Sequence, residues 1–115
     1  MKIFDGAVHD LERALDVRAH KHGVLQGNLA NVDTPGYVPK DVDFDAAMAA
    51  AQNPDNPDGI AEIDESASSS MDGNRVDADR TMAALAENAL QYGAATRVAS
   101  KKLALLRYVA SDGIG

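Results

Sequence analysis

The chain has 115 residues, the length of one domain, and it contains no Cys, which excludes a disulfide framework and a thiolate metal site. Its net charge of −7 argues against a nucleic-acid-binding surface, because phosphate contacts need a basic patch. Aromatic residues make up only 4% of the chain, and Ala supplies much of its hydrophobic content. Because Ala favours helix while burying little area, the composition predicts helices that need a partner surface.

The acidic charge is unevenly distributed along the chain. Residues 41–72 contain nine acidic and no basic residues, whereas residues 1–40 carry five of each and residues 73–115 carry six basic and four acidic residues. The nearly neutral ends can therefore pack densely against similar neighbours with little charge repulsion. No run reaches the length of a membrane span, and the first twenty residues lack the apolar core of a cleavable signal peptide. We expect a cytosolic chain, or one that leaves the cytosol without a cleaved signal.

The first third of the chain predicts a long helix over residues 1–33. Its apolar residues recur in alternating steps of four and three, which is the seam spacing of a coiled coil. The seam positions are Phe4, Val8, Leu11, Leu15, Arg18, His22, Leu25, Leu29 and Val32. Two interpretations are open for Arg18 and His22, which interrupt the apolar pattern. They are long side chains at a partly exposed stretch of the seam, or they set register or pair across an interface.

The segment NLANVDTPGY, residues 28–37, predicts how this helix ends. Pro35 disfavours the helical conformation at the residue before it, so the helix must finish by about Asp33. Pro35 and Gly36 suit the two central positions of a type II turn, in which Pro fixes φ and Gly accepts a positive φ. One Gly would be enough to stop a helix, so the turn is over-specified for that purpose alone.

Residues on both sides of this turn are expected to direct the chain. Asn28 and Asn31 lie three apart on one helix face, where their side chains can bond the departing backbone. Tyr37 follows the turn directly and is placed to pack on the helix end or on a neighbour. Pro39 holds Val38 extended, so the chain is expected to leave the helix in one rigid direction.

The middle of the chain is expected to be mostly irregular. Residues 34–48 are predicted to form the turn and an extended acidic segment that leads into a short helix. Residues 49–75 are predicted to form an acidic low-complexity loop, because they are rich in Pro, Asn, Asp, Gly and Ser. The stretch 41–52 begins like a calcium-binding loop, but it has Ala46 and Gln52 where such a loop needs Gly and Glu.

The last third of the chain predicts a second long helix over residues 76–110, followed by a tail at 111–115. Asp77 or Asp79 is available as its N-cap, where acidic charge is favourable. The seam positions are Met82, Leu85, Ala89, Tyr92, Thr96, Ala99, Leu103, Leu106 and Ala110. The predicted fold class is all-α: the two long helices form an antiparallel, coiled-coil-like hairpin, joined by the extended segment and a flexible acidic loop. One seam on each helix makes a modest core, so full order is expected to require neighbours.

No residue is predicted to be catalytic, to bind a cofactor or to bind a metal. His20 and His22 are two apart and point in different directions on a helix, so they cannot chelate one ion, and His9 is alone. The sequence contains no Gly-rich phosphate-binding motif, no zinc-protease motif and no nucleophile accompanied by a base. The chain is therefore not expected to be an enzyme.

NLANVDTPGY closely resembles the Asn-x-Ala-Asn-x-x-Thr-Pro-Gly-Tyr signature near the N-terminus of flagellar rod and hook proteins. Two further segments, KDVDFDAAM at 40–48 and MDGNRVDADRTMAALAENALQY at 71–92, resemble the proximal-rod members of that family. The resemblance covers residues 1–48 and 71–110. It assigns a turn and assembly motif to Asn28, Ala30, Asn31, Thr34, Pro35, Gly36 and Tyr37.

This resemblance implies a structural subunit of the proximal rod of the bacterial flagellar basal body. Members of the family are exported by the flagellar type III apparatus without a cleaved signal, and they fold as they pack against adjacent subunits. The implied partners are further copies of the chain, the rod proteins FlgC, FlgF and FlgG, the rod-base adaptor FliE, the MS ring and the export gate. The turn would then aim residues 38–48 at a neighbouring subunit. The alternative is a small cytosolic coiled-coil adaptor or a flagellar export chaperone, which two amphipathic helices and an acidic chain would also suit.

Overall fold

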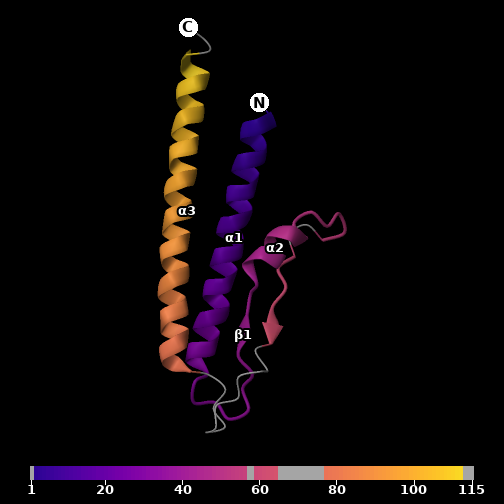
Figure 1. Cartoon of the computed structure of the whole chain (residues 1–115), viewed down its shortest axis with the longest axis vertical. Helices are drawn as coiled ribbons and strands as arrows, with labels where there is room; N and C mark the ends of the chain where they lie inside the picture. The colour runs from indigo at the N-terminus through magenta and orange to yellow at the C-terminus, as the bar shows by residue number, and fades with distance from the viewer. Residues whose placement is uncertain (1, 57–58, 65–76, 113–115) are drawn as a thin grey trace.

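The computed structural model describes residues 2–56, 59–64 and 77–112. Its elements are α1 (Lys2–Ala30), β1 (Lys40–Asp41), α2 (Phe44–Ala50), β2 (Ile63–Asp64) and α3 (Ala78–Asp112). α1 and α3 lie side by side and run in opposite directions, so that α1 begins near the end of the molecule where α3 finishes (Figure 1). The molecule is long and thin, with extents of 67 × 30 × 16 Å. The predicted all-α hairpin is confirmed.

The connection between the two long helices folds back along α1 as an arm, which we define as residues 38–56 and 59–64 (Figure 1). The arm contains α2 and a two-stranded antiparallel ladder, in which Lys40 lies opposite Asp64 and Asp41 lies opposite Ile63. The sequence predicted a loop where β2 lies and gave no sign of this ladder. Residues 57–58 and 65–75 of that predicted loop lie outside the described residues.

Local hydrogen bonds set the starts of α2 and α3. Asp77 caps α3, because its Oδ1 accepts hydrogen bonds from the backbone N–H groups of Asp79 at 3.0 Å and Arg80 at 3.2 Å. Of the two N-cap candidates in the sequence, Asp77 and Asp79, Asp77 is therefore the cap. Asp43 caps α2 in the same way, with Oδ1 accepting from the Ala46 N–H at 3.0 Å. The acidic residues that lead into both helices thus satisfy backbone donors that the helices leave free.

The most buried apolar residues lie between α1 and the arm. Val17 of α1 and Val42 of the arm are fully buried, and Ala47 of α2 is 4% exposed. The partly buried residues around them are Val24, Phe44, Met48 and Ile60. Among the described residues, the hydrophobic side chains in the buried class belong to α1 and the arm, and none belongs to α3. The arm is therefore a larger contributor to the core than the sequence indicated.

The predicted seam of α1 lies on an inner face of the helix. Leu25 is buried, and Leu11, Leu15 and Leu29 are half-buried. The backbone of Phe4 belongs to α1, but its side chain lies outside the described part of the molecule.

The predicted seam of α3 differs from the face that the structure buries. Leu85 and Leu106 are half-buried, but Met82, Tyr92 and Leu103 are 50%, 41% and 49% exposed. Despite these exposed apolar side chains, no helix in the described part of the chain is both long and apolar enough to cross a membrane.

The buried positions of α3 are polar, and each lies one residue before a predicted seam position. Thr81 is 9% exposed and Asn88 is 2% exposed. Asn88 is held there because its Nδ2 donates a hydrogen bond to the carbonyl oxygen of Arg18 on α1 at 2.8 Å. Ala89, at the neighbouring seam position, has a small side chain, so burying it in place of Asn88 would gain little free energy. A polar contact therefore outweighs the weak apolar pattern in setting the rotation of α3.

Candidate functional site

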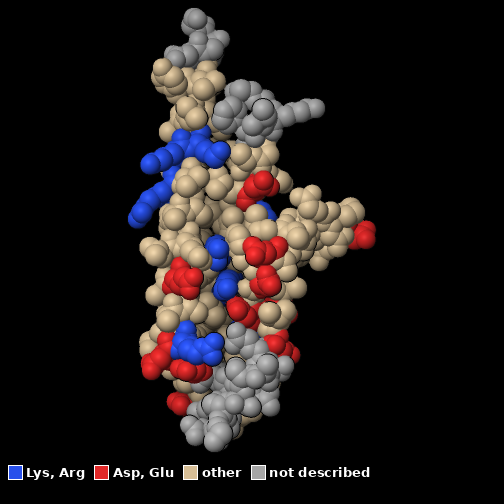
Figure 2. Space-filling view, viewed as in Figure 1, with Lys and Arg blue, Asp and Glu red and all other residues tan. Residues whose placement is uncertain are grey.

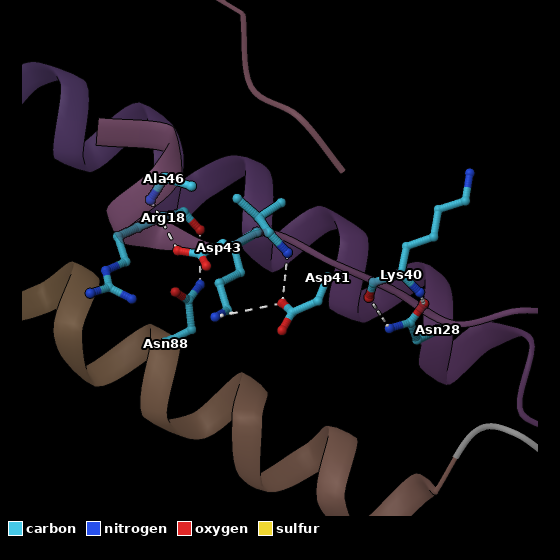
Figure 3. Close-up of polar contacts among 9 residues, drawn as sticks. Arg18, Asn28, Lys40, Asp41, Asp43, Ala46 and Asn88 are labelled. Carbon is cyan, nitrogen blue, oxygen red and sulfur yellow. Dashed lines mark hydrogen bonds and ion pairs between the residues drawn. The ribbon is translucent and has the colours of Figure 1, made fainter. Parts of the chain in front are cut away.

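The turn after α1 is organised around the buried side chain of Asn28, which is 2% exposed. Its Nδ2 donates to the carbonyl oxygen of Lys40 at 2.6 Å, and its Oδ1 accepts from the N–H of the same residue at 2.9 Å (Figure 3). One side-chain amide thus satisfies both backbone polar groups of Lys40, as a neighbouring strand would. This pair of bonds fixes the start of the arm against the end of α1.

Tyr37 reinforces the same junction. Its hydroxyl donates to Asn28 Oδ1 at 3.3 Å, and a Cβ added to Gly27 would lie 3.9 Å from the Tyr37 hydroxyl oxygen. The ring therefore packs back on the last turn of its own helix, which is one of the two positions that the sequence left open. Pro39, which follows in the chain, is buried.

The corner itself has the geometry expected of Pro-Gly. Gly36 has φ of 75°, and the Tyr37 N–H donates to the Thr34 carbonyl at 3.2 Å, which closes the turn. Asn31 supports the helix side of the turn, because its Nδ2 donates to the Gly27 carbonyl at 2.8 Å. The Thr34 hydroxyl in turn donates to Asn31 Oδ1 at 3.1 Å. The turn is thus held by hydrogen bonds on both sides of the corner.

The structure separates the motif residues into two groups. Asn28, Asn31, Thr34 and Tyr37 are joined by hydrogen bonds to one another or to the backbone beside them. Ala30, Pro35 and Gly36 are exposed at the tip of the molecule. The first group therefore holds the turn by hydrogen bonds, whereas Pro35 and Gly36 shape it through their backbone conformation.

The arm lies on its own α1, and this corrects the expectation that residues 38–48 are aimed at a neighbouring subunit. The physical reason is the apolar contact of Val42 with Val17, supported by polar clamps from α1. Lys21 Nζ lies 3.5 Å from Asp41 Oδ1, and that carboxylate also accepts from the Val42 N–H at 2.7 Å. His20 Nε2 lies 3.0 Å from Glu62 Oε1, farther along the arm.

Arg13 is the clamp at the far end of the arm. One guanidinium nitrogen donates to the carbonyl oxygens of both Ala47, at 2.9 Å, and Gly59, at 2.8 Å. Arg13 therefore ties α2 and the returning segment to the same point on α1. The sequence contains a signal for this second face of the helix, because Arg13, Val17, Lys21, Val24 and Asn28 follow helical spacing. The leucine seam is the stronger pattern in this helix, so this second face was not predicted.

Arg18 is half-buried, as is His22, and it makes a contact that neither interpretation from the sequence named. Its guanidinium carbon lies 3.9 Å from the centroid of the Phe44 ring, which is a cation–π contact with α2. Its carbonyl oxygen accepts the hydrogen bond from Asn88 on α3. Arg18 therefore lies where α1, α2 and α3 meet.

The side chains around the turn bond other atoms of their own chain, so these contacts hold the turn in one shape. Among residues 2–56, 59–64 and 77–112, no group of three or more His, Asp and Glu side chains is placed to hold a metal ion. The contacts fix the angle of the turn, the position of the arm and the pairing of the two long helices.

Comparison with known proteins connects this architecture to one family. No family model matches the chain. The chain is 32% identical over 111 residues to the flagellar basal body rod protein FlgB of Yersinia ruckeri, covering 76% of this chain and 81% of that protein. It is 32% identical over 113 residues to FlgB of Escherichia coli K12, covering 76% and 80%. It is 31% identical over 128 residues to FlgB of Bacillus subtilis 168, covering 98% and 99%.

Proposed function

The chain belongs to the FlgB family of flagellar basal body rod proteins and is a structural component of that rod, and we propose that it polymerises there by coupled folding and helix packing with neighbouring axial subunits. The observation that carries this proposal is the exposed apolar surface of α3. Seven large hydrophobic residues of this helix are more than 40% exposed: Met82, Leu90, Tyr92, Val98, Leu103, Leu105 and Tyr108. So many exposed apolar side chains on one helix mark a surface that another molecule covers.

The small core supports coupled folding and assembly. Its fully buried apolar side chains, Val17 and Val42, lie on the arm side of α1, so α3 is held mainly by partly buried residues and by the Asn88 hydrogen bond. A hairpin of this kind is expected to be marginal alone and to gain stability when further helices cover it. Contacts between unlike faces of neighbouring subunits generate an open, head-to-tail polymer when the rotation between subunits does not close into a ring.

The turn sets the shape of each subunit in the proposed polymer. The arm is clamped to α1 by Asn28, Arg13 and Lys21, so it is carried into the assembly as part of each subunit. The exposed corner at Pro35 and Gly36 projects from the end of the hairpin, where it is placed to contact a neighbouring axial subunit.

The charge distribution supports contacts between unlike faces. Acidic side chains lie over α1, the arm and the N-terminal half of α3, whereas basic side chains gather over the C-terminal half of α3 (Figure 2). The basic residues of that half are Arg97, Lys101, Lys102 and Arg107. Complementary surfaces of this kind orient association and suppress contacts between like faces. The proposed neighbours are further copies of the chain, FlgC, FlgF, FlgG and FliE, with the MS ring and export gate at the base of the rod. In this proposal the chain reaches the rod through type III export, without a cleaved signal.

Two measurements test this proposal. Basal bodies isolated from cells that express a tagged chain should contain it, whereas an adaptor or export chaperone would remain in the soluble cell fraction. A circular-dichroism melt of the purified monomer should be broad and begin at a low temperature, because α3 lacks a covering partner. A cooperative transition at high temperature from a fully helical state would contradict coupled folding.

A further inference from the structure

Within the described part of the chain, one face of α1 is covered by neither α3 nor the arm. Its exposed residues follow helical spacing and are His9, Glu12, Asp16, Ala19, Gly23 and Ala30. The N-terminal half of this face carries carboxylates, whereas the C-terminal half is formed mainly by Ala and Gly. Small side chains let a second helix approach closely.

A groove runs along this face, with the arm and the turn as its second wall. Its acidic end is a hollow of about 260 Å³, whose lining includes Glu12, Asp16, Ala51 and Gln52. The next stretch is a hollow of about 490 Å³, whose lining includes Ala19, Gly23, Gly27, Tyr37, Lys40 and Glu62. From Glu12 to Gly27 the groove is about 22 Å long, at ~1.5 Å per residue of α1, so its length suits a helix.

α3 carries a stripe with the matching pattern of charge and size. We define this α3 stripe as the exposed residues Leu90, Ala94, Arg97, Lys101 and Leu105. It lies on a different side of the helix from Asn88, which bonds α1. Its two cations belong to the basic half of α3 (Figure 2). Among the described residues, Asp16, Arg97 and Lys101 take part in no ion pair, so opposite charges are available on two separate surfaces of one chain.

We propose that the α3 stripe of one copy packs antiparallel in the α1 groove of a second copy. The inference rests on the proposed function, because it specifies one subunit contact within the polymer. At a single register three pairs form together: Leu90 with Gly23, Arg97 with Asp16, and Lys101 with Glu12. The register is consistent because seven residues separate the first two pairs on both helices, and four residues separate the last two. A large apolar side chain then lies over glycine, and each cation lies beside a carboxylate.

The polymer fixes the relative direction of the two helices. α1 and α3 run in opposite directions within one chain (Figure 1). Subunits of a head-to-tail polymer all point the same way along its axis, so the α3 of one copy is antiparallel to the α1 of the next. A parallel packing would also bring Arg97 to Glu12 and Lys101 to Asp16, but it requires two copies that point in opposite directions.

The proposed register also displaces one copy along the other. Within a chain, Asn88 lies beside Arg18. In the proposed contact, Ala95 of the second copy reaches the level of Arg18, which is seven residues farther along α3. The copies are therefore offset by about 10 Å along the helix axis, at ~1.5 Å per residue. Subunits related by such a step cannot close into a flat ring, so the contact extends into an open polymer.

Disulfide trapping with Ala19→Cys and Ala94→Cys tests the contact in a chain that has no native Cys. Both alanines are exposed and meet at the proposed register, so the trap leaves Leu90, Arg97 and Lys101 in place. The full chain is expressed in cells, basal bodies are isolated and oxidised, and the products are separated on a denaturing gel without reductant. The same oxidation is carried out on the purified, concentrated chain. A ladder of covalent dimers and larger forms is expected, because a disulfide needs Cα atoms within about 7 Å.

Two further variants examine direction and charge. The control pairs Ala19→Cys with Ala104→Cys, an exposed position about 15 Å beyond Ala94 that would meet Ala19 only in the parallel packing. It should give little cross-linking. Arg97→Glu, added to the Ala19 and Ala94 trap, should lower the yield of the ladder several-fold, and Asp16→Arg added to that variant should restore it. A general loss of helix structure would not be restored by the second change.

The outcomes separate this inference from the proposed function. A ladder specific to the Ala19 and Ala94 pair in either preparation, lowered by Arg97→Glu and restored by Asp16→Arg, supports the contact. Absence of the ladder from both preparations, equal or stronger cross-linking of the Ala104 control, or no restoration by Asp16→Arg overturns it. If the trapped variant is found in basal bodies without a ladder in either preparation, the rod assignment stands and this contact is wrong.

Discussion

The side-chain amide of Asn28 bonds both backbone polar groups of Lys40, twelve residues farther along the chain. Through this contact, the last turn of α1 holds the start of the arm. The Pro35-Gly36 corner reverses the chain so that the contact can form. The Tyr37 hydroxyl then donates a further hydrogen bond to Asn28 Oδ1. The turn therefore determines where the arm begins, and Val42 then reaches its buried position beside Val17.

Replacing Asn28 is expected to release the arm. Asn28→Ala removes two hydrogen bonds to Lys40 and the acceptor of the Tyr37 hydroxyl, so we expect a loss of about 1–3 kcal/mol in the free energy of unfolding. Asn28→Asp should also destabilise, because a carboxylate still accepts from the Lys40 N–H but faces the Lys40 carbonyl without a donor. Urea titration followed by circular dichroism measures both, with the exposed Gln26→Ala as control. Equal stability of Asn28→Asp and the native chain would contradict this account.

Gly36→Val is expected to block assembly while leaving the helices intact. Gly36 has φ of 75°, and a β-branched residue is strained there by roughly 1–2 kcal/mol, although a Cβ would meet no atom within 4 Å. The strain should change the angle of the corner, so we expect loss of motility with a nearly unchanged helical circular-dichroism signal. Gly36→Asn is the matched control, because Asn tolerates a positive φ better than Val. Wild-type motility of the Val variant would count against the role of the turn.

Arg13→Lys is expected to loosen the far end of the arm. A Lys side chain is shorter than Arg, so its ammonium group is not expected to reach both carbonyl oxygens, Ala47 and Gly59, that one nitrogen of the Arg13 guanidinium contacts. We expect faster protease cleavage between residues 51 and 62 and a several-fold faster amide hydrogen exchange in α2. Glu12→Gln, at an exposed neighbouring position, should leave both rates unchanged. Native exchange rates in Arg13→Lys would show that the Arg13 hydrogen bonds are not needed to hold the arm.

The turn could be predicted from the sequence because its determinants are local. Pro35 and Gly36 restrict the backbone at their own positions, and the positive φ of Gly36 follows directly from that restriction. The clamps could not be predicted in the same way. Arg13 and Gly59 are 46 residues apart, and neither carries a local sign of its partner. The predicted features are therefore the helices and the corner, whereas the arm's position on α1 depends on long-range contacts.

The rotation of α3 shows a second limit of sequence patterns. A seam in which Ala89, Thr96 and Ala99 separate the larger side chains creates only a weak preference for one face. The hydrogen bond from Asn88 to Arg18 joins residues 70 positions apart and shifts the buried face by one residue. Apolar spacing thus predicted the helix and its length well, but it could not decide which side chains face α1.

A contrast between two leucines tests whether the exposed face of α3 serves assembly. Leu90 is 73% exposed, so Leu90→Gln should leave the melting curve of the monomer nearly unchanged while it weakens assembly and motility. Leu25 is 5% exposed, and Leu25→Ala should cost about 2–5 kcal/mol of stability by leaving a cavity, which would unfold much of a marginal hairpin. Circular-dichroism melts and swimming assays of both variants separate the two effects. If Leu90→Gln cells swim normally, this part of α3 faces solvent in the rod, and the neighbouring subunit must contact other exposed residues of the helix.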